Sequence, residues 1–521
     1  MSNQIIRQPY ILNRAIGKET SQILLDGDYI IPDAKADMAD ILRGQASLHL
    51  NKVEPAPNRI GFSGKLSMDI LYLAKSAEGV GSLPVVANVD DFINLEGVSP
   101  SSLAILNSNI AHIEYFVIND RKIGYRAVMD LSLTAIENIE ASIVGKIEGL
   151  PEAQQKTAAL SASQIAEMKR DEFVVKQDFV IPQNLPAIGK LLETSIKIAN
   201  KDVKVYNGRV GISGDILLSV MYHAEESNSP VEIMDFELPF SGSIDMKNAK
   251  ENQLAVTKLS VKDSFVQVSE DSGGQNRILQ VEVNIAADIR LTEDASIDIL
   301  EDAYCVDKRL DFEKQPLLIS KLICSNKNQF NVKEAVSLED APEVLQVLSA
   351  TGKVILEDTR VIEDKVIAEG IISADILYIA GLDEKPLQNY SAVIPFKQTI
   401  ETAGTNMDMQ AEIEYSLDRT SFGMISGKEI ELRFLVNFET AVYENRHVDI
   451  INDIQFSQID REEIAAKPSM VVVTIGKNDS LWSIAKNYNA SLSELMEIND
   501  IQNHDEVSFG QKLLVVKKAV D

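Results

Sequence analysis

Residue types that could bind a metal are few and scattered in this sequence. No two histidines have the spacing of a zinc-binding helix, and the two cysteines, Cys305 and Cys324, form no Cys-x-x-Cys motif. We therefore expect no metal site, and we expect surface or packing roles for the histidines. The five histidines are His49, His112, His223, His447 and His504.

Motifs for nucleophilic catalysis and for phosphate binding are also incomplete. Residues 61–64 and 211–214 each place a serine near two glycines, but they lack the Gly-x-Ser-x-Gly spacing of a nucleophile elbow. None of the seven Gly-Lys dipeptides is followed by Ser or Thr, as a Walker A loop requires. The 79 acidic residues could hold an acid/base pair by chance, but a solvated face is the default for so many acids. The sequence thus predicts a non-enzyme without a cofactor.

Composition and charge narrow the remaining classes of function. The chain has 521 residues, enough for three or four domains, and 45 % of them are hydrophobic. Its 50 basic and 79 acidic residues give a net charge of −29, which argues against binding of nucleic acid or of anionic lipid. We find no secretory signal in residues 1–14 and no apolar run long enough to span a membrane. Two cysteines fit a reducing cytosol, the alternative being one bridge between them.

One pattern of residues occurs three times along the chain. A strand-like segment carries Gly64, Gly214 or Gly370, and a tyrosine follows eight residues later in each copy. The spacings of 150 and 156 residues are domain-sized, so each copy should be one domain. The three tyrosines are Tyr72, Tyr222 and Tyr378.

Each copy is predicted to be rich in β-structure. A strand leads into a short helical stretch at residues 34–42, 187–192 and 342–348, and the glycine strand follows. The second half of each copy resembles a β-hairpin, with turns at residues 119–120, 272–274 and 426–427 that are rich in Asn, Asp and Gly. Residues 151–160 consist of helix formers, which favours a helical spacer. The expected division is β domains at 1–148, 171–318 and 319–450, a helical spacer at 149–170 and a linker at 451–469.

Residues 470–518, near the end of the chain, predict a small α/β unit of the order βααβ. Val471, Val473 and Ile475 share one strand parity. Asp479 or Ser480 can cap a first helix whose apolar face includes Leu481 and Ile484. A second helix opens at residues 491–494 with a capping-box pattern.

Three apolar residues of this unit are candidates for contact with a partner. Trp482, the only tryptophan, lies about 100° from the inward face of its helix, on the side of Lys486. Packing in a small core is the alternative for Trp482. Met470 and Val472 have the strand parity opposite to Val471, so we expect them to face outward. Aromatic residues and Met are common interface anchors.

The terminal unit resembles a LysM domain, through residues 478–485, Leu495, Asn499 and residues 510–513. The LysM pattern has glycine where this chain has Asn478, and residues 508–509 also depart from it. The resemblance implies a groove for N-acetylglucosamine polymers between two loops. Its candidate residues here are Lys477, Asn478, Asp479, Ser480, Leu481, Ile501, Val507 and Phe509.

The three upstream copies resemble SPOCS domains, which occur in spore coat assembly proteins. The resemblance rests on the strand that ends with residues 375–378, on its two sister strands and on the prolines beyond them. Three such copies followed by a LysM-like domain are similar to the SipL-like family of spore coat morphogenetic proteins. The resemblance implies a scaffold on the mother-cell side of the forespore, in the cytoplasm, that binds a SpoIVA-like coat ATPase through the LysM-like domain.

Two other functions remain open. One is a carbohydrate-binding protein whose LysM-like domain binds N-acetylglucosamine polymers or peptidoglycan. The other is a cell-wall hydrolase with a LysM targeting module, which the missing catalytic constellation disfavours.

Overall fold

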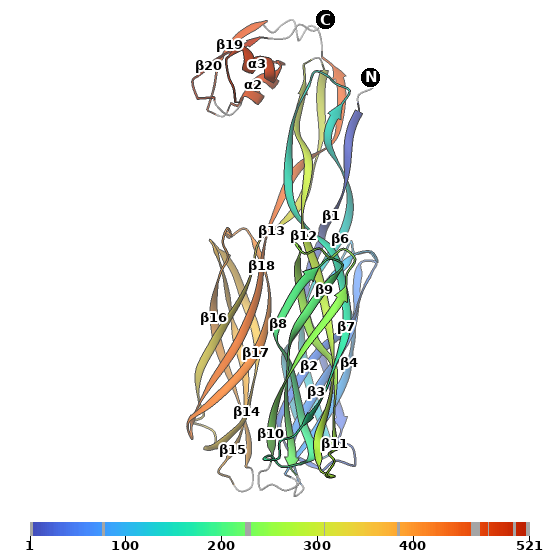
Figure 1. The fold of residues 1–521 in the computed structure, drawn as a ribbon, viewed down its shortest axis with the longest axis vertical. Coiled ribbons are helices and arrows are strands. Elements are labelled where there is room, and N and C mark those ends of the chain that lie inside the picture. Colours follow the sequence, from blue (N-terminus) through green and yellow to red (C-terminus); the bar gives the residue numbers. More distant parts are fainter. Residues whose placement is uncertain are drawn as a thin grey trace.

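The computed structural model describes residues 4–75, 79–224, 231–306, 308–382, 386–459, 469–477, 479–503 and 507–516. The chain forms three β-sandwiches that lie side by side, a narrow stalk that extends from one end of them, and a small α/β unit beside the far end of the stalk (Figure 1). The mainly β architecture with three tandem repeats and a small α/β end is as the sequence predicts.

Each repeat consists of six strands in two antiparallel three-stranded sheets. In the first repeat the sheets have the orders β2-β3-β4 and β1-β6-β5, so the third and sixth strands are central. The second and third repeats have the same two orders, shifted by six and twelve strands. The strands of the first repeat are β1 (Gln4–Ile30), β2 (Met38–Ala56), β3 (Arg59–Ala74), β4 (Val80–Asn94), β5 (Leu103–Asn119) and β6 (Lys122–Glu148).

The other two repeats follow without any change in the order of their strands. The second repeat contains β7 (Ala153–Val180), β8 (Ile188–Tyr206), β9 (Arg209–Ala224), β10 (Glu232–Asp245), β11 (Leu254–Glu270) and β12 (Asn276–Cys305). The third repeat contains β13 (Lys308–Ser337), β14 (Val344–Ile362), β15 (Lys365–Ala380), β16 (Leu387–Glu401), β17 (Gln410–Ser426) and β18 (Glu429–Gln458). The predicted hairpins β5–β6, β11–β12 and β17–β18 are all present.

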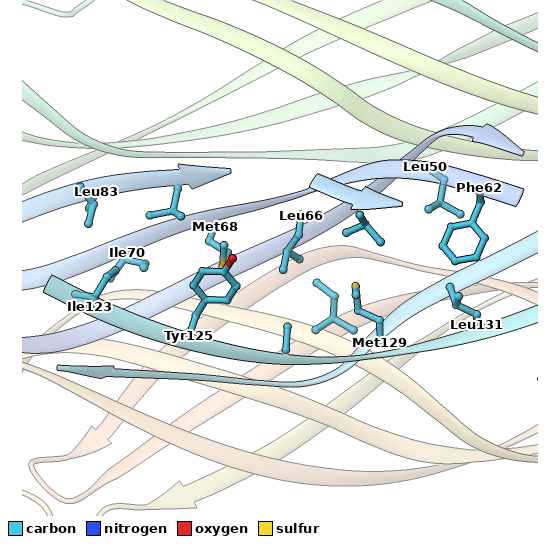
Figure 2. Packing of buried hydrophobic residues seen from close by; sticks show 14 of the residues in the cluster. Leu50, Phe62, Leu66, Met68, Ile70, Leu83, Ile123, Tyr125, Met129 and Leu131 are labelled. Carbon is cyan, nitrogen blue, oxygen red and sulfur yellow. The ribbon is translucent and has the colours of Figure 1, made fainter. Parts of the chain in front are cut away.

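The core of each sandwich lies between its two sheets. Alternate residues of β3 point inward, as the burial of Leu66, Met68 and Ile70 shows, and they face Tyr125 and Met129 of β6 across the core (Figure 2). This alternation is what a strand with one buried face requires. The repeated tyrosine is buried in every copy, and the Tyr72 hydroxyl donates to the Ala36 carbonyl at 3.0 Å.

The three repeated glycines occupy equivalent places, as predicted. Each lies in a central strand opposite a bulge in the neighbouring strand, so a backbone carbonyl approaches it closely. A Cβ on Gly214 would lie 2.9 Å from the Ala199 oxygen, and Gly64 and Gly370 are even tighter. Only glycine leaves room for this approach.

The helices predicted within the repeats are absent from the described residues. Residues 32–37 form a tight turn, closed by a hydrogen bond from Lys35 N to the Pro32 carbonyl, and β2 then begins at Met38. The equivalent residues before β8 and β14 also form turns. The predicted helical spacer is wrong as well, because residues 153–180 form β7. Pairing with β12 and packing of Ala158, Leu160 and Ala162 outweigh the weak helix propensity of these residues.

The longest strands build the stalk, which the sequence analysis did not predict. Beyond Ile136, β6 pairs only with β1, and β12 and β18 continue in the same way with β7 and β13. Apolar residues of the three ribbons pack together along the stalk, among them Leu12, Ile297 and Ile450. The expected boundaries at 318/319 and 450/451 therefore need correction, since they fall inside β13 and β18. Residues 451–458 of the expected linker likewise belong to β18.

The three sandwiches meet around a pseudo-threefold axis. Equivalent residues of the three repeats form one buried apolar cluster there. Its members on the glycine strands are Leu71, Met221 and Leu377, one residue before each repeated tyrosine. The same position of the repeated sequence pattern thus supplies the apolar contact between domains in all three copies.

Candidate functional site

The terminal unit forms the predicted βααβ fold. Strand β19 (Met470–Thr474) pairs antiparallel with β20 (Lys512–Val516), and helices α2 (Leu481–Asn487) and α3 (Leu492–Ile498) lie between them in the chain. Ser480 caps α2, accepting from Ser483 N while the Ser483 hydroxyl accepts from Ser480 N. The core contains Ile475, Leu481, Ile484, Ala485, Ala490, Leu495, Leu513 and Val515.

Trp482 lies at the contact between this unit and the stalk. Its indole Nε1 donates to Asp302 Oδ2 at 2.8 Å, and its ring meets Tyr304 edge-on with centroids 5.1 Å apart. Both partners belong to the last four residues of β12, which ends at Cys305. Trp482 is half-buried and packs at the edge of the core, on the side of Lys486 as its helical position predicts. Its contacts in the structure are therefore within the chain.

Lys486 and Tyr304 complete the same contact. The Lys486 ammonium lies 2.6 Å from Asp302 Oδ1 and 5.7 Å from the centre of the Phe312 ring. The Tyr304 hydroxyl donates to the Ala490 carbonyl at 2.9 Å, and the Tyr304 ring is itself part of the core of the terminal unit. Partial burial disfavours the Asp302 charge, but hydrogen bonds from Lys486 and Trp482 hold the pKa of Asp302 below its usual value.

The sequence analysis missed Asp302 and Tyr304. They precede Trp482 by 180 and 178 residues, and no local motif marks them. In the sequence they resemble many other acidic and aromatic residues of strands. Only the folded stalk places them against Trp482 of α2.

The outer face of the β19–β20 ribbon carries the other two candidate contacts. Met470 is 65 % exposed and Val472 is 62 % exposed, and Leu514, the cross-strand neighbour of Val472, is also exposed. Val473 is on the inner face of the ribbon and packs against the core of the unit, against which Trp482 of α2 also packs. The predicted outward orientation of Met470 and Val472 is confirmed, but they lie on the opposite side of the ribbon from Trp482.

The two loops expected to form a glycan groove lie next to each other. Gly510 N donates to the Ile475 carbonyl at 2.9 Å, which holds the loop before β20 against the loop after β19. On these loops Lys477, Asp479 and Ser480 are exposed, and Phe509 is 76 % exposed.

The remaining groove candidates are less accessible. Ile501 and Val507 are half-buried and pack against the core. Leu481 is 1 % exposed, so its side chain offers no surface to a ligand, and a groove role for that side chain is wrong. Its place on the inward face of α2 is the physical reason. Asn478 lies outside the described residues.

Other chemistry is sparse in the part of the chain that the structure describes. No group of three or more His, Cys, Asp or Glu residues there could hold a metal ion. Among the same residues, no helix is long and apolar enough to cross a membrane. Cys305 is buried and Cys324 is half-buried, and no disulfide joins them.

Comparison with known families agrees with the division into three sandwiches and one α/β unit. The family model described as "SipL, SPOCS domain" matches residues 37–118, 187–269 and 343–425. The LysM domain model matches residues 473–516. No curated protein and no solved structure matches the chain.

Three tandem sandwiches and a small βααβ unit thus define a multidomain protein built from binding-domain families that are not catalytic. The chain is a SipL-like protein, with three SPOCS domains followed by a LysM domain. The first family points to a role in sporulation and the spore coat, and the second points to glycan binding.

Proposed function

We propose that the chain is a non-enzymatic spore coat assembly scaffold whose LysM domain binds a SpoIVA-like coat morphogenetic ATPase on the mother-cell side of the forespore. The observation that carries the proposal is the exposed apolar face of Met470, Val472 and Leu514 on the β19–β20 ribbon. Large apolar side chains that gather on one face mark interaction surfaces more often than isolated ones do.

The position of the LysM domain supports the same function. It lies beside the far end of the stalk, away from the three sandwiches, so a large partner can approach it (Figure 1). Asp302 and Tyr304 bind the helical side of the domain, at Trp482 and Ala490, and hold that side on the stalk. Met470 and Val472 are on the other face, where they are exposed. A partner that used Trp482 would have to compete with Asp302 and Tyr304 for the same ring. Trp482 is therefore a second, conditional contact in the proposal.

The test compares the full chain with its Val472→Lys variant in binding to the purified ATPase. Loss of one interface anchor costs about 2 kcal/mol, so the affinity should fall about thirtyfold. Val86→Lys is the matched control, because Val86 is a similarly exposed strand valine on the first sandwich. Unchanged binding by Val472→Lys would contradict the proposal, as would an equal loss in Val86→Lys.

Binding of N-acetylglucosamine polymers or peptidoglycan is the second candidate function. The adjacency of the loops that carry Lys477 and Phe509 favours it. Because Asn478 and residues 508–509 depart from the LysM pattern, we expect the full chain to sediment weakly or not at all with insoluble peptidoglycan. Strong sedimentation that Phe509→Ala abolishes would make glycan binding the better proposal.

A further inference from the structure

A cavity of about 660 Å³ lies between the three sandwiches, where they meet the stalk. All three repeats line it, through β1, β2, β5 and β6 of the first, β7, β11 and β12 of the second, and β13, β17 and β18 of the third. Its volume is within the range of small-molecule sites, about 300–1,000 Å³. Because the walls are strands of three packed domains, the cavity exists before any ligand enters.

The charge of the lining is opposite to that of the chain. Seven Lys and Arg residues line the cavity against five Asp and Glu residues, although the whole chain has a net charge of −29. Four of the five acids are neutralised by cations of the same lining. These ion pairs are Arg170–Asp288, Arg290–Glu412, Lys327–Glu439 and Lys52–Glu54.

Two lysines of the lining keep their charge unneutralised. Lys18 donates to Gln410 Oε1 at 3.4 Å and Lys258 donates to Asn107 Oδ1 at 3.3 Å, and neither forms an ion pair among the described residues. Asn107, Lys258 and Glu414 are the fifth residues of β5, β11 and β17, so the three repeats place an amide, a cation and an anion at equivalent positions. Uncompensated cations in a polar cleft concentrate anions there.

A buried hydroxyl in the same lining is unpartnered among the described residues. Thr440 is 1 % exposed, and its Oγ1 makes no hydrogen bond to any of them. Buried polar groups are nearly always hydrogen-bonded, so each exception calls for an explanation. An oxygen of a bound anion would accept from this hydroxyl as it would from the two ammonium groups.

We propose that the cavity between the three SPOCS domains binds a small multivalent anion bearing phosphate or carboxylate groups, held by Lys18, Lys258 and Thr440. The three domains together would then form one binding site that none of them has alone. This site is distinct from both surfaces of the LysM domain.

The test is calorimetric titration of the full chain with pyrophosphate and with citrate at fixed ionic strength. We expect saturable binding of at least one probe, and the preferred probe separates phosphate from carboxylate recognition. The Lys18→Gln, Lys258→Gln double variant should lose at least tenfold in affinity. Lys176→Gln, which removes a similar exposed lysine from β7 outside the cavity, should bind as the wild type does.

Thr440→Val is the second variant, chosen in case the double variant fails to fold. Valine has the shape of threonine without the hydroxyl, so the free protein should be at least as stable while anion affinity falls. Circular dichroism of each variant checks the fold. Absence of saturable binding to either probe would overturn the proposal. Wild-type affinity in the folded variants would also overturn it.

Discussion

Arg43 and Glu193 form a buried bidentate ion pair between the first two SPOCS domains. Arg43 Nη2 donates to both carboxylate oxygens of Glu193, at 2.9 and 3.0 Å, and Arg43 Nη1 donates to Ser349 Oγ of the third domain at 3.0 Å. The three residues are the sixth of β2, β8 and β14, so one position of the repeat carries Arg, Glu and Ser. Each domain thus contributes a different side chain to this contact, and the ion pair forms only when the domain with Arg43 lies beside the domain with Glu193.

Removing one member of this pair should destabilise the packing of the domains. Both side chains are about 5 % exposed, so Glu193→Met leaves an uncompensated buried cation at a cost of about 3–5 kcal/mol. The double variant Arg43→Met, Glu193→Met should recover most of that loss, because apolar residues often replace a buried pair well. Urea denaturation of the full chain measures both.

The exposed pair Lys52–Glu54 serves as the control for that measurement. Both of its side chains are about two-thirds exposed, and Glu54→Gln should change stability by less than about 1 kcal/mol. Equal effects of Glu193→Met and Glu54→Gln would show that the Arg43–Glu193 pair does not support the interface.

The repeated glycines predict a second stability effect. A Cβ at Gly214 would meet the Ala199 oxygen at 2.9 Å and the Phe240 ring at 3.0 Å, so Gly214→Ala should cost about 1–3 kcal/mol. Gly423→Ala has open space and should be neutral or stabilise by up to about 1 kcal/mol, since alanine restricts the unfolded chain. Thermal unfolding distinguishes them, and a harmless Gly214→Ala would refute the close approach.

The repeat and the LysM domain could be predicted from the sequence because their signals are local or periodic. Gly64, Tyr72 and the α2 cap each lie within a few residues of the pattern that identifies them. The stalk could not, because residues 151–160 consist of helix formers. Residues 153–160 are held in a strand by pairing with residues 297–305, more than 130 residues further along the chain. The ion pair of Arg43 could have been predicted from the repeat, because alignment of the three copies places Arg43, Glu193 and Ser349 at one position.

The contact between the stalk and the LysM domain should depend on pH. The folded pKa of Asp302 is lowered, so its stabilising contribution is present above the unfolded value of about 3.9 and is lost as pH falls through the folded pKa. Trp482 is the only tryptophan, so its fluorescence reports the contact directly. We expect its emission to shift toward that of exposed tryptophan below about pH 4.

The variant Asp302→Asn separates this effect from general acid unfolding. It retains an acceptor for the indole but loses the charge that pairs with Lys486, so the shifted emission should already occur at pH 7. Asp298→Asn, on the same strand outside the contact, should behave as the wild type does. Wild-type emission from Asp302→Asn at pH 7 would mean that the carboxylate charge does not hold the domain.

Trp482→Ala should release the LysM domain from the stalk without unfolding it. The ring is half-buried at the edge of the core, and its hydrogen bond and aromatic contact both go to β12. Hydrogen exchange of the full chain should therefore show lost protection around Tyr304 but retained protection in α2 and β20. Leu481→Ala is the contrast, because this residue is 1 % exposed and its truncation costs about 2–5 kcal/mol, enough to unfold so small a domain. If Trp482→Ala exposes the amides of α2 and β20 as Leu481→Ala does, the tryptophan is a core residue of the LysM domain. Any loss of partner binding in that variant would then follow from unfolding.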